Sequence, residues 1–192
     1  MTFEFQYIDL LKNILINGEE RTDRTGTGTL SLFSPTLLKF DIEHCIPLMT
    51  TRNLGYKWII KELLWFIRGQ TDNTLLQEQG VHIWDGNSSK DFMDKNNIPL
   101  QENDIGALYG FTMRHWGAEY IDCKTDYTGQ GFDQLIYVEN LIKNDPTSRR
   151  IIMNNWNPSY FGKQVLTPCH QQIQFYVSES KYLFGNLYIM KQ

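Results

Sequence analysis

The segment that decides the fold is Lys57-Trp-Ile-Ile-Lys-Glu-Leu-Leu-Trp-Phe-Ile-Arg-Gly69, which places apolar residues on nearly every side of a helix. This pattern predicts a buried helix over residues 57–69, because a helix that faces solvent keeps a polar side. Its only acidic residue is Glu62. Burial raises the pKa of a carboxyl and suits it to acid or base work, whereas a cation from elsewhere would make Glu62 a structural ion pair. Both interpretations stay open at this point.

The rest of the chain predicts a single domain of the α/β (α+β) class over residues 1–192. Periodicity and turn residues predict helices over residues 3–17 and 133–144, and strands over residues 29–34, 36–42, 150–156, 172–177 and 183–189. Residues 86–131 are rich in Asn, Asp, Ser and Gly, which predicts an irregular surface excursion. No linker long enough to divide domains is present.

Composition excludes several classes of protein. The hydrophobic fraction of 41% and the charged fraction of 21% are those of a globular domain. A net charge of −4 argues against general nucleic-acid binding, because a broad basic surface is missing. No apolar stretch approaches the roughly 20 residues that span a bilayer. Three cysteines without a CxxC pair predict a reducing, cytoplasmic setting.

Three further motifs can carry chemistry, and each also has an ordinary interpretation. Arg24-Thr-Gly-Thr-Gly-Thr29 can meet an oxyanion or can be a flexible turn. Arg149-Arg150 can clamp a phosphate or can be two solvated charges. Cys169, in Thr167-Pro-Cys-His170, can be a reactive thiol, and nearby arginines would lower its pKa. A lone cysteine is otherwise inert.

Taken together, these motifs resemble the thymidylate synthase family from about residue 4 to Tyr188. The segments that carry the resemblance are Asp23-Arg-Thr-Gly-Thr-Gly-Thr-Leu30, Pro47-Leu-Met-Thr-Thr-Arg52, Glu62-Leu-Leu-Trp-Phe-Ile-Arg-Gly69, Ile83-Trp-Asp85, Tyr109-Gly110, Arg114-His-Trp-Gly-Ala-Glu-Tyr120, Asp133-Gln-Leu135, Ser148-Arg-Arg-Ile-Ile152, Trp156-Asn157 and Pro168-Cys-His170. The family's fold implies a mixed, twisted sheet with helices on one face and a second subunit on the other.

The resemblance implies reductive methylation of dUMP to dTMP, with 5,10-methylenetetrahydrofolate as co-substrate and no metal. It implies that Cys169 adds to C6 of the pyrimidine, that Glu62 organises water and proton transfers, and that Tyr109 assists proton removal from C5. The binding residues that it implies are Arg24 on the nucleotide phosphate, Arg149 and Arg150 offered across a homodimer interface, His170 and Asn155 beside the nucleotide, and Trp84 and Asn87 in the folate pocket.

The match stops after Tyr188. The family continues with Gln-Arg-Ser-x-Asp, whereas Ile189-Met-Lys-Gln192 stands here, and Met190 takes the place of a phosphate-binding arginine. We therefore expect an interrupted or partial reading frame, exposed apolar surface and weak activity. Two alternatives remain, a deoxynucleotide hydroxymethylase and a noncatalytic paralogue that binds a longer partner. Two smaller departures, Ala107-Leu108 and Thr112-Met113, lie near the expected cleft.

Overall fold

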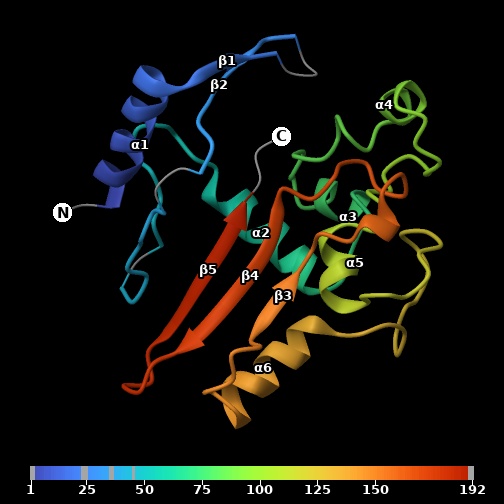
Figure 1. The fold of residues 1–192 in the computed structure, drawn as a ribbon. Helices are drawn as coiled ribbons and strands as arrows, with labels where there is room; N and C mark the ends of the chain where they lie inside the picture. Colours follow the sequence, from blue (N-terminus) through green and yellow to red (C-terminus); the bar gives the residue numbers. More distant parts are fainter. Residues whose placement is uncertain (1–2, 23–25, 35–36, 45, 190–192) are drawn as a thin grey trace. The chain divides into compact units, whose positions relative to one another are not determined.

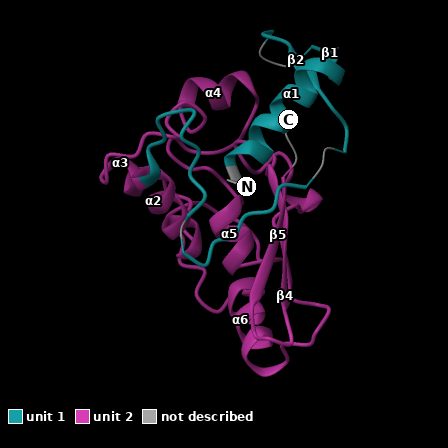
Figure 2. Cartoon of the chain, turned by 90° about the vertical axis from the view of Figure 1, so that its left-hand side faces the viewer, with its two compact units in different colours: residues 1–56 teal, residues 57–192 magenta. Residues whose placement is uncertain are grey.

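The computed structural model describes residues 3–22, 26–34, 37–44 and 46–189. The chain divides into two units, residues 1–56 and residues 57–192, which Figure 2 distinguishes by colour. Each unit is defined by its own internal contacts, so a single domain over residues 1–192 stays a prediction. Among the described residues, no helix has both the length and the apolar character needed to cross a membrane.

The first unit is built from one helix and a short hairpin (Figure 1). Helix α1 (Phe3–Asn17) has the predicted bounds, and β1 (Glu19–Arg21) pairs antiparallel with β2 (Thr29–Ser31). The second predicted strand, residues 36–42, is wrong for residues 37–42, which are irregular. Strand composition describes side chains that fit a sheet, but a strand also needs a backbone partner.

Helix α2 (Tyr56–Ile67) confirms the predicted helix and ends two residues before the predicted end. The N–H of Gly69 donates to Phe66 O at 2.9 Å, and the N–H of Gln70 donates to Trp65 O at 3.2 Å. This pair of bonds is a Schellman motif, and it needs a left-handed residue, which Gly69 supplies at φ 75°.

The prediction that α2 is buried all round is wrong. Trp65 and Phe66 are buried, whereas apolar side chains on its other sides are exposed, among them Trp58 (53%), Ile59 (46%), Leu63 (51%) and Leu64 (43%). Composition locates apolar side chains but does not reveal which of them meet a packing partner. The exposed apolar surface expected from the sequence is therefore present.

The predicted irregular excursion contains two helices, so that prediction is wrong for residues 90–95 and 109–114. Helix α3 (Thr74–Gln77) precedes it, and α4 (Lys90–Lys95) and α5 (Tyr109–Arg114) lie within it. Phe111 of α5 is fully buried and meets Tyr120 and Tyr127 edge-on, each with a centroid distance of 4.9 Å. These aromatic contacts anchor the segment to the interior.

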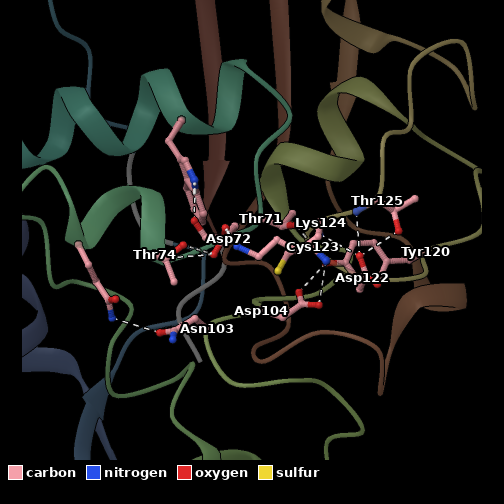
Figure 3. Close-up of polar contacts among 12 residues, drawn as sticks. Thr71, Asp72, Thr74, Asn103, Asp104, Tyr120, Asp122, Cys123, Lys124 and Thr125 are labelled. Carbon is pink, nitrogen blue, oxygen red and sulfur yellow. Dashed lines mark hydrogen bonds and ion pairs between the residues drawn. The ribbon is translucent and has the colours of Figure 1, made fainter.

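A buried hydrogen-bond network ties the same segment to the turn after α2 (Figure 3). The carboxyl of Asp104 accepts bonds from the hydroxyl of Tyr120 and from the amides of Gly106 and Cys123. Since the Tyr120 hydroxyl donates to Asp104, the Thr71 hydroxyl donates to Tyr120, at 3.0 Å. Burial, followed by the charge of Asp104, raises the pKa of the Cys123 thiol to about 12, so this thiol is unreactive.

The second unit is completed by a helix and a three-stranded sheet. Helix α6 (Gln134–Asn144) confirms the prediction, and the sheet has the order β3 (Ile152–Asn154), β4 (His170–Val177) and β5 (Leu183–Ile189), with a 3-10 turn, η1 (Pro158–Tyr160), between β3 and β4. Both strand pairs are antiparallel, with Met153 opposite Ile173. The α+β class is confirmed, while β3 is shorter than the predicted residues 150–156.

Helix α5 crosses the turn that follows α2 at backbone contact distance. A Cβ atom at Gly110 would lie 2.3 Å from the carbonyl oxygen of Gln70 and 2.9 Å from the carbonyl carbon of Gly69. Neither atom belongs to a flexible side chain, so any residue larger than glycine would force the backbone to shift.

This crossing predicts a steric cost for Gly110→Ala. The added methyl must push two backbone segments apart, and overpacking of this kind costs about 1–3 kcal/mol. For a chain of this size, that cost lowers the melting temperature by roughly 2–12 °C. Gly86→Ala is the matched control, since a Cβ there meets nothing within 4 Å. Equal melting temperatures for the two variants in thermal circular dichroism would contradict the crossing.

Candidate active site

The backbone of Cys169 is held by a buried phenol. Cys169 lies directly before β4, and Tyr109 opens α5 with 5% of its surface exposed. The Tyr109 hydroxyl accepts the N–H of Cys169 at 2.8 Å and the N–H of His170 at 3.3 Å. One side chain therefore fixes two successive peptide groups, and it orients the thiol through the main chain.

Glu62 and Trp84 form a second polar contact of the site. The indole Nε1 of Trp84 donates to Glu62 Oε1 at 2.7 Å, and Trp84 is 7% exposed. Burial raises the pKa of Glu62, and the bond from Trp84 opposes that shift. Of the two interpretations left open by the sequence, the raised pKa favours the acid or base over an ion pair.

An aromatic cluster joins these two contacts. The ring of Phe66 lies 4.9 Å from that of Tyr109 and 6.3 Å from that of Trp84, and the rings of Trp84 and Tyr109 are 6.4 Å apart. Burial raises the pKa of Tyr109, and negative charge on Cys169 or Glu62 raises it further. No sequence motif indicated a role for Phe66, although it stands one helical turn after Glu62.

The loop that carries Trp84 is fixed from behind by Asp85. The Asp85 carboxylate accepts bonds from Gln77 at 2.9 Å, from Asn73 at 2.8 Å and from His82 at 2.8 Å. These bonds lower the pKa of Asp85, and the bond from Gln77 contributes most. Asn87 is half-buried in the same loop, and its N–H donates to Trp84 O at 3.1 Å. The sequence did not reveal that Asn73 and Gln77 support this loop.

His170 and Asn155 lie immediately behind the thiol. The His170 ring lies 5.2 Å from the Tyr109 ring, and burial lowers the pKa of its imidazole. Asn155 is 1% exposed, and both polar atoms of its side chain bond to protein groups, Nδ2 to His170 O and Oδ1 to the Thr112 hydroxyl. In this arrangement its amide faces the interior.

The predicted arginines are not brought into this cluster. Arg149 and Arg150 are exposed, and neither guanidinium has an ion-pair partner in the part of the chain that is described. They lie in a turn before β3, so the strand predicted over residues 150–156 is wrong for Arg150. Arg24 lies outside the described residues.

Comparisons with known proteins identify the family of the chain. The family model described as thymidylate synthase matches residues 5–190. The thymidylate synthases of Candida albicans and Saccharomyces cerevisiae are 54% and 53% identical to the chain over 92% and 93% of its length. The bifunctional dihydrofolate reductase-thymidylate synthase 1 of Arabidopsis thaliana is 49% identical over 93% of the chain.

The chain spans only part of these relatives. It covers 57% of the Candida enzyme, 59% of the Saccharomyces enzyme and 34% of the bifunctional Arabidopsis protein. The matched region contains all the residues of the cluster built above. With a family model over nearly its whole length and relatives at about half identity, the chain belongs to the thymidylate synthase family.

Proposed function

We propose that this chain carries the dUMP-methylating centre of a thymidylate synthase. The Cys169 thiolate would add to C6 of dUMP, and the resulting electron-rich C5 would attack the one-carbon unit of 5,10-methylenetetrahydrofolate. The observation that carries the proposal is the pair of hydrogen bonds that the amides of Cys169 and His170 donate to the Tyr109 phenol oxygen. These bonds support the proposal because they hold the main chain of the candidate nucleophile against the side chain of the candidate proton carrier.

The phenol is arranged for proton transfer. Because the Tyr109 oxygen accepts two amide donors, its own O–H is directed elsewhere, and among the described residues no acceptor for that proton is recorded. Tyr109 would therefore assist removal of the C5 proton. Glu62, whose raised pKa brings it toward neutral pH, would organise the water and proton transfers around the pyrimidine.

The binding roles rest on the family resemblance. Arg24 would grip the phosphate of dUMP, His170 would lie beside the nucleotide, and Trp84 and Asn87 would line the folate pocket. Support for the last role comes from the Asp85 bonds that hold their loop in place. A hydroxymethylase is not favoured, since the similar proteins reported above are thymidylate synthases.

Covalent capture of 5-fluoro-dUMP by the purified chain tests the proposed function. We expect an intact-mass increase of one nucleotide in the wild type and none in Cys169→Ser, because only a thiolate in position can add to C6. Dependence of the adduct on methylenetetrahydrofolate would support the folate pocket. A folded wild-type chain that captures nothing would contradict the proposal and favour the noncatalytic paralogue.

The burial of Glu62 predicts how stability changes with pH. A carboxyl whose pKa is raised by folding stabilises the fold below its unfolded value, and this contribution is lost as pH rises through the folded value. Glu62→Gln keeps an acceptor for Trp84 and removes the titration. We expect the variant to match the wild type near pH 4.5 and to be more stable near pH 8 in urea unfolding. Lower stability of the variant near pH 8 would instead indicate a paired carboxylate.

We also propose that the chain forms a homodimer through the outer face of its sheet. Alternation along β4 and β5 places Tyr176, Phe184 and Tyr188 on the face opposite Ile173 and Phe175, which pack on the core. These three aromatic side chains are 62%, 46% and 41% exposed. Aromatic surface of this kind is enriched at interfaces. Arg149 and Arg150, both exposed, would reach the phosphate site of the partner.

Sedimentation velocity tests the dimer. We expect the wild type to sediment as a dimer and Tyr176→Lys/Phe184→Lys as a monomer, because two buried charges oppose association. Ile121→Lys is the matched control, since Ile121 is 64% exposed in a loop outside the sheet. If the sheet variant sedimented with the wild type, this interface would be excluded.

A reducing, cytoplasmic location is also part of the proposal. Cys123 and Cys169 are both free thiols. A nucleophilic thiol needs a compartment that keeps it reduced.

A further inference from the structure

Asn155 bonds two successive carbonyl groups behind the candidate nucleophile. Its backbone N–H donates to Gln171 O at 2.8 Å, and its side-chain Nδ2 donates to His170 O at 3.1 Å. The side chain is 1% exposed, so water does not compete for these bonds. Asn155 therefore holds the segment after Cys169 by two hydrogen bonds, one from the main chain of Asn155 and one from its side chain.

The position of Asn155 at a distortion of the sheet explains the need for a side-chain bond. The pairing of β4 with β5 shifts between His170 and Gln172, which marks a bulge or irregularity. A bulge interrupts the ladder and redirects the neighbouring side chains. The His170 carbonyl lies at this interruption, and the Asn155 amide supplies a hydrogen-bond donor to it.

Thr112 fixes the orientation of that amide. The His170 carbonyl can only accept, so the Nδ2 of Asn155 must face it, and Oδ1 then faces the Thr112 hydroxyl at 3.1 Å. In this contact the Thr112 hydroxyl is the donor, because Oδ1 has no proton, and the same hydroxyl also lies within hydrogen-bond distance of two carbonyl oxygens of its own helix turn, Tyr109 O at 3.2 Å and Leu108 O at 3.3 Å. Thr112 is fully buried on α5, three residues after Tyr109.

We infer that Thr112 and Asn155 are a positioning pair for Cys169. Helix α5 holds the main chain of Cys169 and His170 at two places, at their amides through Tyr109 and at the His170 carbonyl through Thr112 and Asn155. Both polar atoms of the Asn155 side chain already bond to protein groups, so in this inference the pair acts through the direction of the thiol. This inference rests on the proposed function, in which Cys169 is the nucleophile, and it adds the residues that aim it.

Thr112→Val provides the test, with Thr112→Ser as the matched control. Valine keeps the shape and removes the donor, whereas serine keeps the hydroxyl. At saturating 5-fluoro-dUMP we expect Thr112→Val to slow covalent capture roughly 10–100-fold, the cost of a misplaced reacting atom. The half-saturating nucleotide concentration should stay within about 2-fold, because binding groups are untouched. Thr112→Ser should restore the rate. Wild-type capture by Thr112→Val would overturn the inference.

Asn155→Ala gives an independent check through a double-mutant cycle. It should slow capture at least as much as Thr112→Val, because it removes the donor to His170 directly. Since Thr112 acts only through Asn155, the double variant Thr112→Val/Asn155→Ala should be no slower than Asn155→Ala. If the slowing of capture in the double variant equalled the product of the two single effects, the inference would be overturned, because the two residues would then act separately.

Amide hydrogen exchange without nucleotide separates this inference from the proposed function. We expect the amides of Cys169 and His170 to exchange faster in Thr112→Val than in the wild type or Thr112→Ser, while protection of α6 stays unchanged. A wild type that captures no 5-fluoro-dUMP would remove the proposed function. Hydrogen exchange would still test the positioning pair. Unchanged exchange rates at these two amides in Thr112→Val would overturn the inference, and faster rates would support it.

Discussion

The contact between α5 and the turn after α2 is the constraint on which the site depends. At Gly110 the two backbones approach so closely that no side chain fits between them. Glu62 and Phe66 belong to α2, and Tyr109 and Thr112 belong to α5. Because this contact fixes α5 against the turn that ends α2, it sets the place from which Tyr109 reaches the segment before β4.

Burial then gives the site its chemical character. It raises the pKa values of Glu62 and Tyr109 and lowers that of His170, so all three groups are shifted toward their neutral forms. Asp85 is in the opposite situation, because three hydrogen-bond donors hold its carboxylate charged. The two carboxyl groups thus have different roles: Glu62 can exchange protons, and Asp85 supports a loop.

Local sequence predicted some elements well and others poorly. The helix Phe3–Asn17 and the strand Leu183–Ile189 have the predicted bounds, since their residue types and end signals agree. Helices α4 and α5 were missed, because six residues are too few to display a helical period. Helix α5 is stabilised by contacts of Phe111 with Tyr120 and Tyr127, and Met93 of α4 is fully buried in the hydrophobic core.

The sequence by itself determined the family, the class of fold and the types of residue at the site, because each of these is written in motifs of a few adjacent residues. Tertiary structure alone decided how they meet. Tyr109 reaches the amide of Cys169 across 60 positions, and Thr112 reaches Asn155 across 43. No local pattern records such a contact, since the chain between the partners sets their distance. The pKa shifts follow from the same packing, because desolvation depends on every group that surrounds a side chain.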